Sequence, residues 1–276
     1  MTKKSEKGNN IIGIIPCAGK GTRLGILPFS KELFPLGEKK YEGRVIPKVA
    51  CDYLIDHMVG AGIEDIHFIL RKGKWDIPNY YGGGLMHGFK SYYHIADYTY
   101  GVPFSINQAF PIFENKIVVL GFPDILFKPE NAFNRLLEVF HRNDEIDIVL
   151  GVMPVLRPEK WDMVELDNKQ NVKRLIIKSI NGKKMQYGWT IAAWKPRFSR
   201  FLNNRITSVL KEKTKTEFEK SEIYFGHIIM EAINKGLTVK GVIFENGKCL
   251  DIGTPGDLIY STTFLKDNNE NINFKN

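Results

Sequence analysis

Residues 14–23 have the sequence IIPCAGKGTR, and residues 30–35 have the sequence SKELFP. The apolar start of the first segment predicts a buried strand, and its glycines predict a tight loop directly after that strand. Glycines let successive backbone N–H groups close on an anion, and the side chains of Arg23 and Lys31 would add two positive charges. The two segments together therefore predict a phosphate-binding site at the end of a strand.

Two common glycine loops do not fit this spacing. The Walker loop requires Ser or Thr after its Gly-Lys pair, whereas Gly21 follows Gly19 and Lys20. The dinucleotide-binding fingerprint would need a third glycine at position 24, which is Leu24. We therefore expect neither a P-loop nor a dinucleotide site.

The loop resembles the signature of the sugar nucleotidyltransferases, the pyrophosphorylases that make nucleotide sugars. The matching segments are residues 18–23, AGKGTR, and residues 31–35, KELFP. They are most similar to bacterial UTP:glucose-1-phosphate uridylyltransferases and glucose-1-phosphate thymidylyltransferases. In that family the glycine loop wraps the nucleotide, and the arginine and lysine neutralise its phosphates. The resemblance implies catalytic roles for Arg23 and Lys31 and nucleotide binding by four loop residues, namely Ala18, Gly19, Gly21 and Thr22.

Size and composition allow one large α/β domain or two smaller ones and predict a soluble protein. The chain has 276 residues, of which 43% are hydrophobic, enough for a substantial core. Its net charge of +8 comes from scattered lysines, which favours a solvated surface over a nucleic-acid groove and suits polyanionic substrates. Three cysteines without a Cys-x-x-Cys pair and the lack of a long apolar run predict a cytoplasmic protein without a membrane partner. The sequence leaves open whether it forms a homo-oligomer.

Apolar runs of strand length alternate with helical patterns along the chain. This alternation predicts the α/β class, with a Rossmann-like, mixed but mostly parallel sheet flanked by helices. The expected strands of this sheet are residues 11–16, 65–70, 102–107, 116–122 and 147–153.

Shorter strands separated by turn-rich segments follow, and they predict a small antiparallel hairpin insertion at about residues 160–195. We expect a single nucleotidyltransferase domain over residues 1–266 and a disordered tail over 267–276, which is rich in asparagine. The glycines at 82–84 predict a hinge or a lid.

Two aspartates supply the expected acidic half of the site. Asp124 follows the predicted strand 116–122, at the edge where ligands bind in open α/β sheets. Its segment resembles the family's Leu-Gly-Asp strand end, whose aspartate holds Mg²⁺ and takes part in catalysis. Asp251 begins the segment DIGTP, which resembles the segment with the family's second metal ligand. Two carboxylates suffice for Mg²⁺, although turn or capping roles remain the alternative for both residues.

The acceptor side matches the family less closely. Lys178 fits the lysine that grips the acceptor phosphate, with a plain surface lysine as the alternative. Asp162 stands where the family has a glycine beneath the sugar, and Ile177 replaces a glutamate that holds sugar hydroxyls. We expect acceptor contacts from Lys178, Asp162 and Trp189, and an acceptor that either differs from glucose 1-phosphate or is held differently.

The nucleobase side rests on a weaker match. Pro103 and Gln108 align with a run that reads the pyrimidine in the family. Gln108 could donate a hydrogen bond to the base or ribose, and a helix-capping role is the alternative.

Together these residues predict a Mg²⁺-dependent transfer of a nucleoside monophosphate from UTP, dTTP or CTP to a sugar 1-phosphate, with release of pyrophosphate. The acceptor phosphate is already ionised at neutral pH, so positioning and cations would do the catalysis. Three alternatives stay open: a non-sugar phosphomonoester as acceptor, a glycosyltransferase of related fold, and a non-catalytic nucleotide-sugar sensor. The glycosyltransferases usually carry an Asp-x-Asp motif, which this sequence lacks.

Overall fold

The computed structural model describes residues 10–212, 218 and 222–266, so the predicted tail at 267–276 lies outside the described residues. The strands are β1 Ile11–Pro16, β2 Pro35–Tyr41, β3 Arg44–Val49, β4 Asp65–Arg71, β5 Lys90–Ala96, β6 Ile117–Leu120, β7 Ile125–Lys128, β8 Ile148–Pro154, β9 Asp162–Leu166, β10 Val172–Ile177, β11 Tyr187–Trp194, β12 Val239–Ile243 and β13 Lys248–Asp251. The helices are α1 Ala50–Gly60, α2 Asp76–Tyr81, α3 Val102–Asn107, α4 Phe110–Phe113, α5 Ala132–Arg142, α6 Pro196–Glu212, α8 Phe225–Asn234 and α9 Pro255–Lys266.

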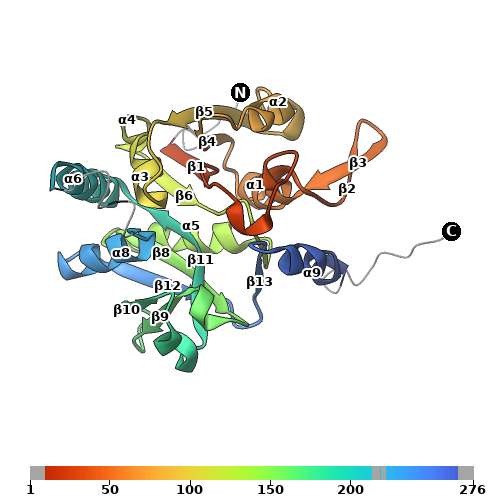
Figure 1. Cartoon of the computed structure of the whole chain (residues 1–276). Coiled ribbons are helices and arrows are strands. Elements are labelled where there is room, and N and C mark those ends of the chain that lie inside the picture. Colours follow the sequence, from red (N-terminus) through yellow and green to blue (C-terminus); the bar gives the residue numbers. More distant parts are fainter. Residues whose placement is uncertain (1–9, 213–217, 219–221, 267–276) are drawn as a thin grey trace, which may run out of the picture.

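A mixed sheet forms the centre of the molecule (Figure 1). Strand β1 lies in its middle and pairs in parallel with β4 and β6, and β4 pairs in parallel with β5. Beyond β6, the strand β11 runs antiparallel to both β6 and β8, and β12 pairs in parallel with β8. The predicted α/β class is confirmed.

Helices cover both faces of this sheet because its strand residues alternate between two cores. On one face, Ile12 and Ile14 of β1 pack with side chains of α3, α4, α6 and α8. On the other face, Ile15 packs with side chains of α1 and α5. Successive side chains of a strand are therefore buried on opposite faces of the sheet, as the continuous apolar runs predicted.

One expected strand is wrong, because residues 102–107 form the helix α3. Gly101 before it adopts a φ of 128°, and Pro103 occupies the first helical turn, where proline is tolerated. The fourth parallel strand is β5, whose sequence KSYYHIA was too polar to predict. Short apolar runs do not separate a strand from a buried helix by periodicity.

The predicted hairpin strands all belong to the main sheet. Strands β9 and β10 pair antiparallel with each other, as expected. Strand β11 lies between β6 and β8 and also pairs with β9, at Gly188 and Met163, which joins the hairpin to the sheet. This placement matters for function, because β11 brings Trp189 to the same edge of the sheet as the end of β6.

The C-terminal part of the described chain returns to the first strands. Strand β13 pairs antiparallel with β7, and a small core that includes Leu126, Leu250, Ile252 and Phe264 joins this pair to α9. Among the described residues, no helix has the length and apolar character needed to cross a membrane.

Candidate active site

The phosphate loop leaves β1 and turns through two short 3₁₀ segments. Gly21 and Gly25 bracket the first segment, Thr22–Leu24, with φ angles of 67° and 78° that favour glycine. The second segment, Lys31–Leu33, is held from below by a buried ion pair, in which Lys74 Nζ lies 2.6 Å from Glu32 Oε1. The conformation of the loop is therefore set by Gly21 and Gly25 in its first part and by the ion pair of Glu32 in its second part.

Lys31 and Asp124 form an ion pair at the mouth of this loop. Burial acts to raise the pKa of the Asp124 carboxyl, but the charge and hydrogen bond of Lys31, with help from Arg23, hold that pKa below its usual value. Burial acts to lower the pKa of Lys31, and Asp124 raises it above its usual value. Both side chains are therefore charged at neutral pH.

Backbone pairing places the second predicted acid beside the first. The register of β13 on β7 puts Asp251 opposite Ile125, and the Ile252 amide donates a hydrogen bond of 2.8 Å to the Asp124 carbonyl oxygen. Burial, followed by the nearby charge of Asp124, raises the pKa of the Asp251 carboxyl. Two carboxylates thus repel each other across a small gap.

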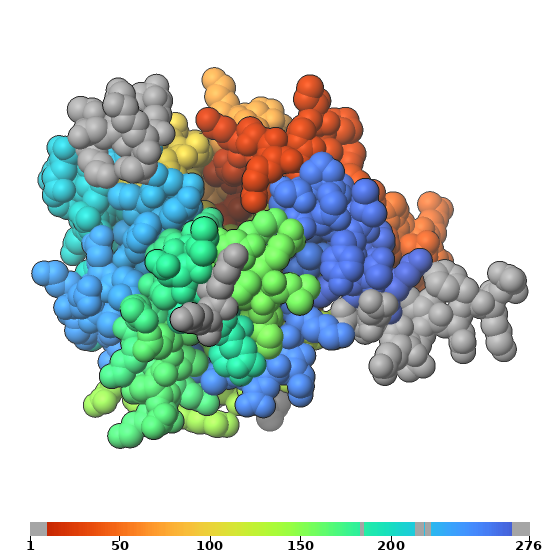
Figure 2. Space-filling view, turned by 60° about the horizontal axis from the view of Figure 1, so that its bottom comes forward, coloured from red at the N-terminus to blue at the C-terminus, as the bar shows by residue number. Residues whose placement is uncertain are grey.

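Arg23 completes the charged group. A Cβ atom built on Gly253 would lie only 3.0 Å from Arg23 Nη2, so the guanidinium rests against the glycine of the DIGTP segment. Figure 2 shows the red N-terminal segment adjoining the dark-blue C-terminal segment on one face of the molecule. Residues at opposite ends of the sequence therefore form one cleft, as predicted.

The donor set fits a hard divalent cation. Asp124 and Asp251 supply carboxylate oxygens, and their mutual repulsion would be relieved by a cation between them. No cluster of three or more His, Cys, Asp or Glu side chains suited to a metal exists among the described residues. Mg²⁺ accepts one or two carboxylates and takes its other ligands from phosphate and water, so two aspartates are sufficient.

A cavity of about 200 Å³ opens from this charged group on the acceptor side. All three predicted acceptor residues, Lys178, Asp162 and Trp189, line it, as do Asp124 and Asp251. Trp189 Nε1 donates a hydrogen bond of 3.3 Å to Asp162 Oδ2. The structure therefore brings the predicted acceptor and metal residues into one space.

A larger cavity of about 860 Å³ lies on the nucleotide side. Ala18, Gly19 and Lys31 line it, and it shares Asp124 with the acceptor cavity. Gly21 lines an adjoining hollow, together with Gly19 and Lys31. The two cavities thus meet at the carboxylate of Asp124.

Three predicted nucleotide residues lie outside the linings of these cavities: Thr22, Pro103 and Gln108. The Gln108 amide is used within the fold, where it accepts from the Asp97 amide at 2.7 Å and donates to the Tyr98 carbonyl at 2.8 Å. Residues 97–101 line the nucleotide cavity. Gln108 is thus a positioning residue for that loop.

Sequence reasoning missed most of the aromatic lining of the acceptor cavity, which consists of Phe122, Trp161, Tyr224 and Phe225. These rings come from three parts of the chain, since Tyr224 and Phe225 are neighbours, and no spacing in the sequence connects the three parts. The one local signal was Asp162, which stands where the family has a glycine.

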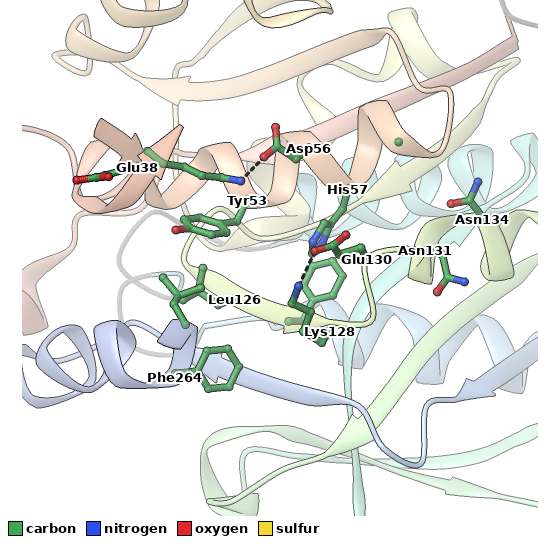
Figure 3. Close-up of a pocket in the computed structure, with 14 residues that line it drawn as sticks. Glu38, Tyr53, Asp56, His57, Leu126, Lys128, Glu130, Asn131, Asn134 and Phe264 are labelled. Atoms are coloured by element: carbon green, nitrogen blue, oxygen red, sulfur yellow. Dashed lines mark hydrogen bonds and ion pairs between the residues drawn. The ribbon is translucent and has the colours of Figure 1, made fainter. Parts of the chain in front are cut away.

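A separate cavity of about 530 Å³ lies between α1, β7, the start of α5 and α9 (Figure 3). Four of its charged groups form two ion pairs, Lys48 with Asp56 and Lys128 with Glu130. Burial lowers the pKa of His57 there to about 4, so this ring is neutral. None of the residues predicted for catalysis lines this cavity.

The α/β fold of this chain is similar to the folds of solved proteins of the nucleotidyltransferase type. Its structure matches that of a protein provisionally named glucose-1-phosphate thymidylyltransferase from Bacillus anthracis, in complex with sucrose, with a TM-score of 0.75 over 96% of this chain and 98% of that one at 20% identity. It matches a UTP-bound UGPase from Acinetobacter baumannii with a TM-score of 0.72 over 96% of this chain and 95% of that one at 16% identity. These two likenesses show the fold.

In sequence, the chain is 27% identical over 257 residues to the bifunctional protein GlmU of Methanococcus aeolicus, covering 92% of this chain. The match covers 54% of the relative, so the chain spans about half of that protein's length. No protein-family model matches the chain. The resemblance to the sugar nucleotidyltransferases predicted from the loop is confirmed.

Proposed function

We propose that this protein is a nucleotidyltransferase, which transfers a nucleoside monophosphate from UTP, dTTP or CTP to a phosphomonoester such as a sugar 1-phosphate and releases pyrophosphate. The observation that carries this proposal is that two cavities share Asp124, with Lys31 lining the nucleotide side and both Arg23 and Lys178 lining the other. The similar proteins support it, because one is a UTP-bound UGPase.

The reaction needs two anions brought together. The acceptor phosphate oxygen attacks the α-phosphorus, a new P–O bond forms, and the bond to pyrophosphate breaks. The nucleophile is already ionised, so no general base is required. Arg23 and Lys31 would bind and orient the triphosphate, and Lys178 would hold the acceptor phosphate in line.

Asp124 and Asp251 would hold Mg²⁺, which when bound supplies positive charge to the phosphate oxygens. The ion pair with Lys31 keeps Asp124 in its ionised form, ready to bind a cation. The residues of this chain thus arrange and neutralise charge and move no proton.

The test is pyrophosphate release on mixing each triphosphate with a panel of sugar 1-phosphates and other phosphomonoesters, with and without Mg²⁺. We expect release to require both substrates and the metal. Formation of a nucleoside diphosphate by loss of the terminal phosphate, without pyrophosphate, would contradict the proposal, as would the absence of any product from the whole panel.

A further inference from the structure

The acceptor cavity contains a carboxylate that the protein itself leaves incompletely bound. Asp162, at the start of β9, is only 8% exposed and lines the cavity. Its Oδ2 accepts the hydrogen bond from Trp189, whereas its Oδ1 is buried without a hydrogen-bond partner among the described residues. A buried carboxylate oxygen without a partner is costly, so this atom points to a ligand that would complete it.

The fold makes room for this carboxylate. Gly226, in the first turn of α8, faces it so closely that a Cβ atom there would lie 2.6 Å from Asp162 Oδ2. The same Cβ atom would lie 2.5 Å from Ile177 Cδ1. The position of Asp162 therefore depends on a neighbouring residue without a side chain.

Aromatic rings surround the rest of the space. Phe122, Trp189 and Phe225 line it, with ring centroids 5.7 Å apart for the first pair and 6.0 Å for the second. Trp161 and Tyr224 add two further rings. The negative faces of such rings attract ammonium groups, and most strongly where water is excluded.

The charge balance favours a cation over a neutral hydroxyl as the group that reaches Asp162. Burial raises the pKa of Asp162 even though the charge of Lys178, the Trp189 N–H, His227 and the backbone N–H of Lys178 all act to lower it. No ion pair within 4.0 Å joins Lys178 to Asp162 among the described residues, and Lys178 Nζ lies 4.2 Å from the centre of the Tyr224 ring. The cation of Lys178 is therefore left for a phosphate, while the charge of Asp162 lacks a full counterion.

We infer that the acceptor is a phosphomonoester that carries an ammonium group, whose cation Asp162 and the surrounding rings bind. This inference rests on the proposed function, because it names the class of acceptor for that reaction. The phosphate would lie toward Lys178 and Asp124, and the ammonium group toward Asp162. The source of the ammonium group, an amino sugar or an amino alcohol, is decided by the experiment.

Two matched pairs of acceptors test it in the pyrophosphate-release assay. The first pair is glucosamine 1-phosphate and glucose 1-phosphate, and the second is ethanolamine phosphate and 2-hydroxyethyl phosphate. Within each pair the members differ only by an amine in place of a hydroxyl. We expect kcat/KM to be higher for the ammonium member of at least one pair by tenfold or more.

Asp162→Asn keeps the side-chain shape and removes its charge, and the expected result is a loss of this preference, with the ratio approaching one. The ratio is measured within one protein, so a partial loss of folded enzyme cancels. Glu165→Gln is the matched control, because Glu165 lies on the same strand, is paired with Arg174 and is absent from the cavity lining. It should keep the wild-type ratio.

Equal kcat/KM within both pairs, a preference for the hydroxyl members, or an unchanged ratio in Asp162→Asn would overturn the inference while leaving the nucleotidyltransferase function in place. An equal fall of the ratio in both variants would also overturn it. The absence of pyrophosphate with every acceptor would contradict the proposed function itself, and the inference with it.

Discussion

The nucleotide half and the acceptor half of the cleft differ in how their charged side chains are paired. On the nucleotide side, two ion pairs hold charged groups in place, Lys31 with Asp124 and Lys74 with Glu32. On the acceptor side, five aromatic rings line the cavity together with charged side chains, and Asp162 keeps one buried oxygen without a hydrogen-bond partner among the described residues. Under the proposed function, the nucleotide half would neutralise the phosphates of a nucleoside triphosphate, whereas the acceptor half would select the acceptor. Substitutions in one half should therefore leave the task of the other half unchanged.

The largest effect should come from the residue that both halves share. Asp124→Asn removes the counterion of Lys31 and one expected metal ligand, so turnover should fall by about 10²–10³-fold with every acceptor. Stopped-time pyrophosphate release measures this loss. Asp144→Asn is the control, because Asp144 is fully exposed and paired only with Lys195. Near-normal turnover in Asp124→Asn would show that Asp124 does not serve both halves of the cleft.

The second largest effect on turnover is expected from the contact between Arg23 and Gly253, which lie near opposite ends of the chain. A Cβ atom on Gly253 would press on the Arg23 guanidinium at 3.0 Å, so Gly253→Ala should displace this cation and lower turnover by about tenfold. Gly256→Ala is the matched control, since its Cβ would approach nothing closer than 3.9 Å. Equal rates in the two variants would show that Arg23 does not act through this position.

Substitution of Gln108 tests whether the two halves are independent, because it should affect the nucleotide half alone. Gln108→Ala removes the hydrogen bonds that hold residues 97–101, each worth about 1 kcal/mol, so KM for the triphosphate should rise several-fold. KM for the acceptor should stay unchanged. Asn107→Ala is the matched control at the neighbouring position, because the Asn107 side chain donates a hydrogen bond to Asn203 of α6 instead. An equal rise in both KM values would contradict the separation.

The smallest expected effect is on thermal stability, and it comes from Asp162 in the acceptor half. The pKa of Asp162 is raised in the folded protein by burial, so at neutral pH its ionised form favours the unfolded chain. Asp162→Asn should therefore raise the midpoint of thermal unfolding of the ligand-free protein at pH 7. Below the raised pKa the wild-type carboxyl is protonated, so this difference should shrink as the pH falls toward the ordinary value of about 3.9.

A lower midpoint for Asp162→Asn at pH 7, or a difference that grows in acid, would mean that the carboxylate is already stabilised by the protein. Such a result would remove the contrast between the two halves. Lys178 and His227 act electrostatically on Asp162, so the wild-type protein and the variant are compared with each other at every pH.

The sequence predicted that the loop cations and two distant aspartates lie together, for a physical reason, and their roles stay predictions. The positions of Arg23, Lys31 and Asp124 follow from a strand end and a glycine loop, and Asp251 follows from a local motif before a helix. Each of these signals lies within a few residues, where backbone geometry is decided locally.

The acceptor half could be predicted only in part. Asp162, Lys178 and Trp189 were found by alignment with the family pattern, but the surrounding rings meet only through the packing of β6, β9, β11 and α8. Likewise, residues 102–107 form a helix because Gly101 and Pro103 direct the chain, which outweighs their apolar run. Gln108 was predicted near the base, yet tertiary hydrogen bonds use its amide elsewhere.

The account depends on the attack of an acceptor phosphate on the α-phosphorus across Asp124. Phosphorus NMR of the reaction mixture, with Mg²⁺, a triphosphate and a phosphomonoester acceptor, observes this bond directly. We predict two mutually coupled resonances from a new diphosphate that joins the two substrates, together with one equivalent of pyrophosphate. A spectrum that contains only free nucleoside diphosphate and inorganic phosphate, with no new diphosphate, would contradict it.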